Sequence, residues 1–184
     1  MCHTSISDLE LSKMLSLVLR HKPEAIGISL DKNGWANVNE LIEKLNTKRE
    51  LKLNLAILEH IVETNNKKRF IFNEDKTKIR ANQGHSIEVE LNLKETVPPV
   101  TLYHGTSSRF TSSILKTGLE KRNRNHVHLS FDIETAKKVG LRHGGTLVIF
   151  KVNCKQMLAD GFKFYLSENK VWLTERVPAK YLSL

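Results

Sequence analysis

The sequence predicts an α+β fold built from two lobes, and three observations support this prediction. Short helical patterns in the first half of the 184-residue chain are followed by a pattern typical of a β-hairpin. Residues 86–99 alternate polar and apolar side chains and end at Pro98-Pro99, which is typical of a connector. The second half interleaves short apolar strand patterns with helical ones, so we expect a mixed α/β lobe there.

The N-terminal lobe is predicted over residues 1–92 and begins with an amphipathic helix. Asp8 is a suitable N-cap for this helix, and Pro23 ends it because the residue before a proline disfavours helical backbone angles. Asn33-Gly34 predicts a tight turn between two brief strands. These strands, two further helices and a hairpin are expected within 27–36, 37–45, 53–65 and 69–81. Several short helices followed by a hairpin are the element order of a winged-helix domain.

The C-terminal lobe is predicted over residues 98–184. Its strands are expected at 100–103, 127–129, 146–152, 164–166 and 171–173, with helices near 107–117 and 132–139. Strands this short do not build a large doubly wound sheet, so we expect smaller sheets.

Composition limits the classes of function. The chain has 29 basic and 20 acidic residues and a formal net charge of +9, which favours a polyanionic partner such as nucleic acid. Charge alone does not decide this, because many basic proteins bind no nucleic acid. Cys2 and Cys154 are too few for a disulfide framework or a zinc site, which fits a reducing compartment. With no apolar run of membrane-spanning length and no secretory pattern, we expect a cytoplasmic protein without a membrane partner.

Two cationic clusters lie in the N-terminal half. Residues 19–23 end the predicted helix with an arginine, a histidine and a lysine, which either stabilise the helix C-terminus or bind an anion. The second cluster comprises residues 67–70 and the stretch 79–86, where many hydrogen-bond donors surround Gly84. Such donors suit phosphate and sugar oxygens, and the glycine permits close approach. The alternative is a polar turn that closes the hairpin.

Two further motifs lie in the C-terminal half. The motif at 103–107, Tyr-His-Gly-Thr-Ser, is expected where a strand enters a helix, so that its backbone N–H groups face a phosphate or ribose. In residues 122–130, strand alternation places His126 and His128 on one face. The sequence offers no third ligand in register, so we expect no metal.

These motifs favour phosphate chemistry that relies on electrostatic stabilisation. The sequence has no serine elbow, Walker loop or Rossmann glycine fingerprint. Arginines and histidines grouped in several places are suited to stabilising phosphate charge and poorly suited to activating a nucleophile.

Taken in order, the motifs resemble the KptA-type RNA 2′-phosphotransferases, a family of NAD-dependent tRNA 2′-phosphotransferases. The likeness to the RNA-binding half rests on Leu11-Ser12-Lys13, Leu19-Arg20-His21-Lys22-Pro23, Gly34-Trp35 and residues 79–86. The likeness to the second half, which is built like the ADP-ribosyltransferases, rests on residues 103–106, 126–130, 160–162, 167–169 and 171–174. Lys170 stands where a small residue is expected.

The resemblance implies a winged-helix-like lobe, an ADP-ribosyltransferase-like lobe and a two-step reaction. In the first step the RNA 2′-phosphate attacks the anomeric carbon of the nicotinamide ribose of NAD⁺ and expels nicotinamide. In the second step the adjacent ribose 2″-hydroxyl attacks phosphorus, which releases 2′-OH RNA and ADP-ribose 1″,2″-cyclic phosphate. NAD is therefore expected as a consumed co-substrate, RNA with a tRNA-like splice junction as the partner, and a monomer as the working form.

The catalytic residues of the family fall on Arg20, His21, Arg69 and Arg124. Guanidinium groups grip a phosphate dianion bidentately and neutralise charge that develops on phosphorus. His21 would donate to this phosphate or act as a general acid–base, since an imidazole titrates near neutral pH. Arg80 competes with Arg69, and the Lys-Arg-Phe motif favours Arg69.

The resemblance also implies an NAD⁺ site and an RNA site. The NAD⁺ site comprises His104, Gly105, Thr106, His128, Leu129, Ser130, Phe164 and Val171. Val171 stands where many ADP-ribosyltransferases place a catalytic glutamate, and an apolar residue fits because an ionised phosphate nucleophile needs no base. Phe164 would pack on the nicotinamide, although a strand aromatic more often lies in the core. The expected RNA-binding residues are Lys22, Arg80, Asn82, Gln83, Gly84, His85 and Ser86.

Two other functions remain open on the sequence. An ADP-ribosyltransferase of the same fold would modify nucleic-acid phosphates and stop after the first step. A winged-helix regulator would bind nucleic acid without catalysis, although the intact His104-Gly105-Thr106 motif and Arg124 argue against a degenerate second lobe. Binding of NAD⁺ distinguishes the regulator from either enzyme.

Overall fold

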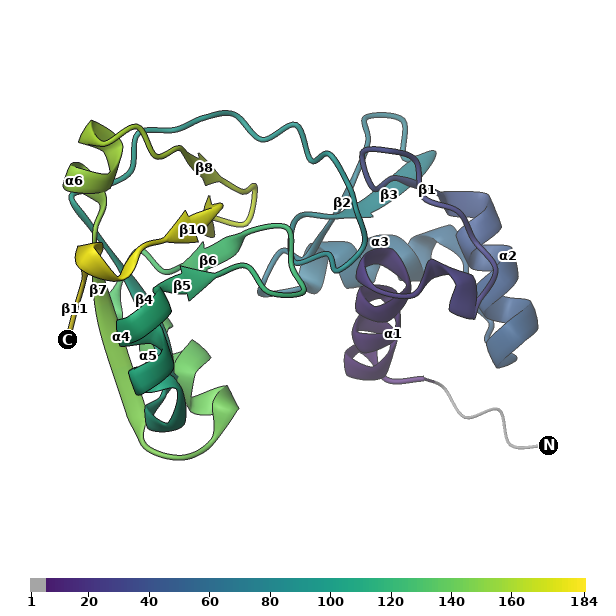
Figure 1. The fold of residues 1–184 in the computed structure, drawn as a ribbon. Coiled ribbons are helices and arrows are strands. Elements are labelled where there is room, and N and C mark those ends of the chain that lie inside the picture. The colour runs from purple at the N-terminus through teal and green to yellow at the C-terminus, as the bar shows by residue number, and fades with distance from the viewer. Residues whose placement is uncertain (1–5) are drawn as a thin grey trace. The chain divides into compact units, whose positions relative to one another are not determined.

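The structure is a computed structural model that describes residues 6–184, so Cys2 lies outside the described part of the chain. Within that part the chain forms six α-helices and several small antiparallel sheets, which makes it a mixed α/β protein. It divides into two compact units, which we call unit 1 (through Asn92) and unit 2 (from Leu93 onward) (Figure 1).

Unit 1 begins with helix α1, which spans Asp8–Arg20. Its N-cap is Ser7, and the prediction of Asp8 was wrong by one residue. The Ser7 hydroxyl accepts a hydrogen bond from the Glu10 backbone N–H, and the Glu10 carboxylate accepts one from the Ser7 backbone N–H. This reciprocal capping box satisfies two backbone donors, which a cap at Asp8 would not do.

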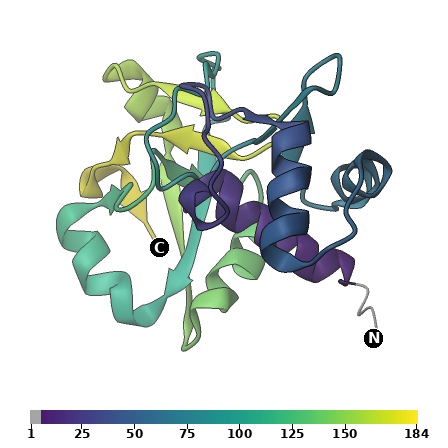
Figure 2. The same cartoon turned by 90° about the vertical axis from the view of Figure 1, so that its right-hand side faces the viewer.

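Helices α2 (Val38–Arg49) and α3 (Leu55–Thr64) lie where the sequence predicts helices. Asn37 and Asn54 cap them, because each side chain accepts a hydrogen bond from a first-turn backbone N–H. A short 3₁₀ helix, η1 (Pro23–Ala25), follows α1. Figure 2 turns unit 1 toward the viewer and shows its helices running in different directions.

The sheet of unit 1 has three short antiparallel strands in the order β1-β3-β2. Strands β2 (Phe70–Phe72) and β3 (Lys78–Ala81) form the predicted hairpin. The pair of strands predicted within 27–36 is wrong: the turn at Asp31–Gly34 forms, but β1 (Ala36–Asn37) pairs with β3. A partner distant in sequence determines this pairing, and local turn chemistry does not reveal such a partner.

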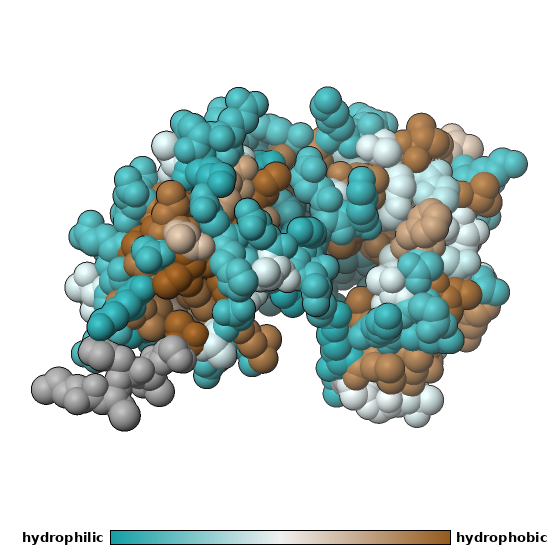
Figure 3. Space-filling view, turned by 180° about the vertical axis from the view of Figure 1, so that it is seen from behind, coloured by the Kyte–Doolittle hydropathy of each residue, from teal (hydrophilic) through white to brown (hydrophobic). Residues whose placement is uncertain are grey.

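A single hydrophobic core joins the helices and the sheet of unit 1. It contains Leu15 and Leu19 of α1, Leu41 of α2, Leu58 of α3 and Ile79 of β3, all fully buried. Hydrophilic side chains cover much of the surface in Figure 3. No helix in residues 6–184 is both long and apolar enough to cross a membrane.

Unit 2 has antiparallel strands in the orders β11-β7-β4, β6-β9-β8 and β10-β5. The strands are β4 (Thr101–Ser107), β5 (Leu119–Glu120), β6 (Val127–Leu129), β7 (Leu147–Asn153), β8 (Phe164–Leu166), β9 (Trp172–Thr174), β10 (Arg176–Val177) and β11 (Leu182–Ser183). Strand β4 runs beyond the predicted end at Tyr103, because β7 pairs with it as far as Ser107. Residues 93–99 carry one isolated bridge, between Glu95 and Tyr165, in place of a strand.

The helices of unit 2 lie between these strands. They are α4 (Thr111–Thr117), α5 (Ile133–Gly140), α6 (Cys154–Ala159) and the 3₁₀ helices η2 (Ser108–Phe110), η3 (Leu141–His143) and η4 (Ala179–Tyr181). The helix predicted from residue 107 therefore begins later, after η2. Helix α5 lies where the sequence predicts a helix, and Asp132 is its N-cap. The Cys154 thiol is fully buried, and this burial raises its pKa to about 12.

Helix α5 packs tightly on strand β4. A Cβ atom at Gly105 would lie 1.8 Å from the Ala136 carbonyl oxygen, and one at Gly140 would lie 2.8 Å from the Thr106 nitrogen. Glycine at both positions lets the two backbones touch, and this contact holds one face of β4 in place.

Candidate active site

In unit 1, the end of α1 is joined to the hairpin strands by Arg20. Its Nη2 donates to the Arg69 carbonyl oxygen at 3.4 Å, and its guanidinium lies 5.9 Å from the ring centre of Phe70. Gly84 lies beside the same group, because a Cβ there would be 3.6 Å from Arg20 Nη1. The structure thus brings together Arg20, Arg69 and Gly84, three residues that the sequence assigns to the phosphate and RNA sites.

The loop after β3 is fastened to the end of α1 by a second pair of contacts. His21 Nδ1 lies 2.9 Å from the Ser86 hydroxyl oxygen, and the Ser86 backbone N–H donates to the Arg20 carbonyl oxygen at 3.0 Å. Both side chains are exposed. These contacts orient the His21 ring at the surface, beside Arg20 in the chain.

Arg69 and Arg80 have different surroundings. The Arg69 carbonyl oxygen accepts from both Arg20 and the Asn82 backbone, which keeps residue 69 at the end of α1. The Arg80 guanidinium stacks 4.5 Å from the ring centre of Trp35. The Arg69 backbone thus lies against Arg20, and the charges of Arg20 and Arg80 both act on His85. Trp35 entered the sequence analysis only as part of the Gly34-Trp35 motif, and a tryptophan directly after a tight turn was the available signal.

Two of the expected RNA-binding residues are buried in this structure. Asn82 is 5% exposed, and its side chain donates to the Lys68 carbonyl oxygen at 2.6 Å. His85 is 0% exposed. Both side chains therefore shape the loop from within, whereas Lys22 and Ser86 are exposed and Gln83 is partly exposed.

His85 lies uncharged beneath the cations of unit 1. Burial lowers its pKa to about 4, and repulsion from Arg20, His21 and Arg80 acts in the same direction. Neither ring nitrogen has a hydrogen-bond partner among the described residues. A neutral ring at this position packs against the turn at Gly34, whose Cβ would lie 3.3 Å from His85 Nε2, without adding to the local positive charge.

In unit 2, three side chains form a linked set on neighbouring strands. His104 Nδ1 lies 3.2 Å from the His128 carbonyl oxygen, and Arg124 Nη1 lies 3.3 Å from His128 Nδ1. A carbonyl only accepts and a guanidinium only donates, so His104 Nδ1 carries a proton and His128 Nδ1 does not. Both histidines thus have defined tautomers, which fixes the polarity that each presents to a ligand.

Ser130 is brought to this set by the backbone. Tyr103 and Ser130 exchange two hydrogen bonds, at 2.9 and 2.8 Å, so the end of β6 lies against β4. His104 and Ser130 are both partly exposed. The structure therefore groups His104, His128 and Ser130, as expected for an NAD⁺ site.

The structure changes the interpretation of Gly105 and Thr106. They lie inside β4, paired with β7, and not at a helix start, so the prediction of helix N–H groups facing a ligand was wrong. Gly105 permits the approach of α5, and Thr106 is only 4% exposed. Their contribution in this structure is to position His104.

Burial also limits two apolar members of the expected NAD⁺ site. Phe164 is 0% and Leu129 is 2% exposed, and both belong to the core of unit 2. Phe164 is therefore a core residue, which was the alternative interpretation of this strand aromatic, because a fully buried ring does not reach a nicotinamide. Val171 is partly exposed in the turn with Ser167, where its N–H donates to the Ser167 hydroxyl at 3.0 Å.

Other residues near the set were not assigned from the sequence. Phe131, which follows Ser130, is 63% exposed, and a large exposed aromatic beside a polar motif is a signal for a stacked ligand. His126 packs edge-on against Tyr165, and burial lowers its pKa, assisted by the charge of Lys121. Within residues 6–184, no three His, Cys, Asp or Glu side chains are grouped so that they could hold a metal ion.

Comparisons with known proteins agree on the class of protein. A family model described as "RNA 2'-phosphotransferase, Tpt1 / KptA family" matches residues 7–176. A "Probable RNA 2'-phosphotransferase" of Fusobacterium nucleatum is 58% identical over 176 residues, which cover 96% of this chain and 98% of the relative. One of the same description from Flavobacterium johnsoniae is 62% identical over 172 residues, covering 94% and 93%.

A third relative, from Hahella chejuensis, carries the same description and is 52% identical over 173 residues, covering 94% of this chain and 92% of the relative. The matched proteins are transferases named for a phosphate at the RNA 2′ position. The chain belongs to the Tpt1/KptA family of RNA 2′-phosphotransferases, as its motifs predicted.

Proposed function

We propose that this protein removes a 2′-phosphate from RNA by NAD⁺-dependent phosphotransfer. The observation that carries the proposal is the end of α1, where the Arg20 guanidinium donates to the Arg69 carbonyl oxygen and Ser86 holds the His21 ring. Arginine is the side chain best suited to a phosphate dianion, because its planar guanidinium donates two parallel hydrogen bonds. Family membership supplies the position of that phosphate on the RNA.

The linked set of unit 2 supports NAD⁺ as the co-substrate. His104, His128 and Ser130 are hydrogen-bonding groups, partly exposed and held by paired strands. Such groups suit ribose hydroxyls, which both donate and accept. The exposed Phe131 offers an aromatic surface beside them. These residues fit a nucleotide sugar in their hydrogen-bonding chemistry.

The proposed chemistry has two steps, both of which depend on bound phosphate charge. The RNA 2′-phosphate, already ionised, attacks the anomeric carbon of the nicotinamide ribose, and nicotinamide leaves with the electrons of the broken bond. The ribose 2″-hydroxyl then attacks phosphorus, the bond to the RNA 2′-oxygen breaks, and that oxygen takes up a proton. Arg20, Arg69 and Arg124 would stabilise the negative charge on the phosphoryl oxygens, and His21 would transfer the proton.

We also propose the two-lobe architecture, the cellular location and the RNA partner that the sequence predicts. Unit 1 would be a winged-helix-like RNA-binding lobe over residues 1–92, and residues 98–184 would form an ADP-ribosyltransferase-like lobe. Three helices and the β2–β3 hairpin in unit 1 support the first assignment. We propose a cytoplasmic monomer that requires no metal and acts on RNA of the tRNA splice-junction type.

The proposal is tested with an RNA that carries one radiolabelled internal 2′-phosphate, incubated with the protein with and without NAD⁺. We expect the label to move to ADP-ribose cyclic phosphate only when NAD⁺ is present. Label that stays on RNA which has become ADP-ribosylated would replace the proposal with the one-step transferase. No reaction and no NAD⁺ binding would instead support the nucleic-acid-binding regulator.

A further inference from the structure

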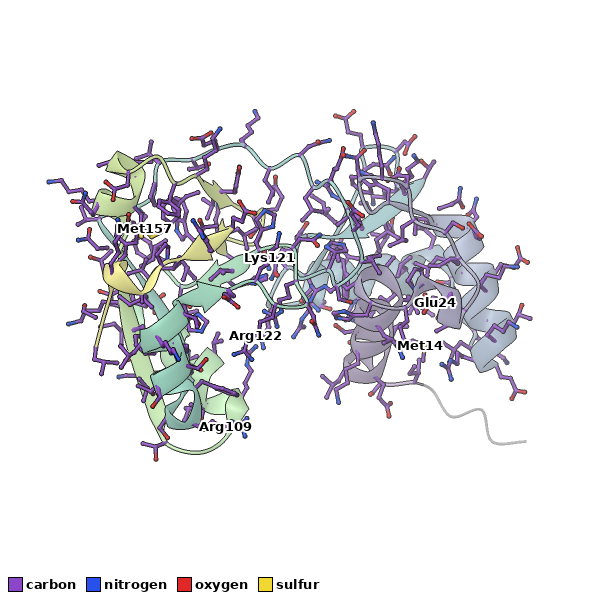
Figure 4. The ribbon with its side chains drawn as sticks, in the orientation of Figure 1. Met14, Glu24, Arg109, Lys121, Arg122 and Met157 are labelled. Carbon is purple, nitrogen blue, oxygen red and sulfur yellow. The ribbon has the colours of Figure 1, made fainter. Side chains whose placement is uncertain are left out.

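A second group of cations in unit 2 is centred on one aromatic ring. Arg109 Cζ lies 4.7 Å and Arg122 Cζ lies 5.4 Å from the ring centre of Phe110 (Figure 4 labels both arginines). Because both distances are measured from one point, the two guanidiniums lie at most about 10 Å apart. The ring itself is partly buried against the core of unit 2, so it is a fixed support.

The surrounding sequence is strongly basic. Residues 107–126 contain five lysines and arginines and one acidic residue, Glu120. Arg109 and Arg122 are both exposed, and the contact with Phe110 holds them together.

This arrangement is costly for a purely structural feature. Arg122 has φ of 51°, in the left-handed region, which costs a non-glycine residue about 1–2 kcal/mol. An exposed cation–π contact returns only about 0.5–1 kcal/mol. Bringing two like charges to one ring adds repulsion, which a bound anion would convert into attraction. The combination of strain and like charge therefore favours a role in anion binding.

We propose that Arg109 and Arg122, aligned on Phe110, bind phosphodiester groups of the RNA that flank the reacting 2′-phosphate. This inference rests on the proposed function, because it takes RNA as the substrate. Guanidiniums fixed on a ring lose little freedom when they bind phosphate, and such contacts position a strand without reading its sequence. Arg109 and Arg122 would thus hold the RNA chain through its phosphodiesters.

The experiment is the salt dependence of RNA affinity, measured with the full-length protein and two oligonucleotides. One is a long single strand with a central 2′-phosphate, and the other is a trimer with the same 2′-phosphate. The variants are Arg109→Gln, Arg122→Gln and the double variant. The matched control is Arg176→Gln, which removes an exposed arginine 6.0 Å from the ring centre of Phe162. Circular dichroism and thermal unfolding confirm that all variants fold.

For the long RNA, we expect the slope of log K against log salt to fall by about 0.7 for each arginine removed and about 1.4 for the double variant. The trimer should show a smaller change, because it keeps only the two phosphodiesters next to the 2′-phosphate, and Arg176→Gln should match the parent. An unchanged slope in the double variant, or an equal loss in the control, overturns the proposal. A protein that binds no RNA would also overturn the proposal.

Two further measurements separate this site from its rivals. The dissociation constant for NAD⁺ should be the same in the parent and the double variant. If it rises while the RNA slope is unchanged, the arginines bind the NAD⁺ pyrophosphate, and the proposal is wrong. RNA binding needs no turnover, so a protein that shows the expected slopes but transfers no 2′-phosphate contradicts the proposed function and leaves this site standing.

Discussion

The candidate sites of the two units are built in opposite ways. In unit 1, charged side chains gather where a helix ends and a loop returns, around the buried, uncharged His85. In unit 2, mostly neutral donors and acceptors stand on two strands whose backbones are paired with each other and with β7. The arrangement in unit 1 concentrates positive charge. The arrangement in unit 2 fixes the direction of each hydrogen-bonding group and the tautomer of each histidine.

This difference corresponds to two kinds of ligand chemistry. A phosphate dianion is held by the number and proximity of guanidiniums, so its site tolerates a loop that adjusts around it. A ribose is distinguished by the direction of each hydroxyl, so its site needs rigid strands. We therefore expect charge removal to be most damaging at the arginines proposed to bind phosphate, and backbone disturbance to be most damaging in unit 2.

The largest expected effect is on activity when a phosphate-binding arginine is removed. Arg20→Ala and Arg124→Ala should each lower kcat by about 10²–10³-fold, the usual cost of losing one group that stabilises transition-state charge. Arg20→Lys should restore little, because a lysine does not donate in a planar fork. Steady-state kinetics with a 2′-phosphorylated RNA provide the measurement. Arg49→Ala, which removes an exposed arginine at the end of α2, is the matched control and should keep parental activity.

The pH dependence of stability should reveal His85. Between pH 4 and 6.5 the folded protein binds fewer protons at this ring than the unfolded chain does, because the pKa of His85 is lowered to about 4. Unfolding therefore takes up a proton, and the free energy of unfolding falls by about 3 kcal/mol as the pH decreases through this window. Urea unfolding at a series of pH values should show this fall in the parent and a much smaller one in His85→Gln.

His126 of unit 2 is a second histidine with which His85 can be compared. Burial lowers the pKa of His126 too, so it contributes with the same sign, but it is only partly buried. His126→Gln should therefore flatten the pH profile less than His85→Gln does. Equal profiles for the parent and His85→Gln would show that His85 is not the buried titrating group.

Backbone disturbance is the matching test in unit 2. Gly105→Ala places a methyl group 1.8 Å from the Ala136 carbonyl oxygen, so α5 must move away from β4. We expect a loss of about 1–3 kcal/mol in the free energy of unfolding, typical of overpacking. Gly161→Ala, where nothing lies within 4 Å of the new atom, should cost only the strain of its φ of 86°. If urea midpoints show equal losses, the close packing of α5 on β4 is not what requires a glycine at 105.

The smallest expected effect concerns Lys170, where the sequence departs from the expected small residue. Its φ is 60°, in the left-handed region that favours glycine. Lys170→Gly should therefore raise the free energy of unfolding by roughly 1 kcal/mol, because it relieves this strain. Differential scanning calorimetry would detect the rise in Tm. A fall in Tm would mean that the lysine side chain contributes more than its backbone strain costs.

Local chemistry made much of the fold predictable. Helical patterns identified α2 and α5, and short apolar patterns identified β6 and β8 within their observed bounds. The pairing of β1 with β3 was not predictable, because the turn at Asp31–Gly34 suggests a local hairpin and the true partner lies about 40 residues away.

The family was predictable from the order of the motifs, whereas the surroundings of individual residues were not. The order of motifs placed Arg20, His104 and Arg124 in a known family, and the structure links two of them through His128. The donor-rich loop gave no sign that His85 is fully buried, because polar residues in a turn are usually exposed. Gly105 looked like a ligand-binding glycine, whereas the structure shows that a helix contacts it.

The most direct test of the central claim is the stoichiometry of the two products in one reaction. Nicotinamide release and loss of the RNA 2′-phosphate should be measured together, with 2′-phosphorylated RNA and with the same RNA lacking that phosphate. The account predicts one nicotinamide for each 2′-phosphate removed, and no nicotinamide from the unphosphorylated RNA. Phosphate loss without nicotinamide release, or nicotinamide release that leaves the phosphate on the RNA, would contradict it.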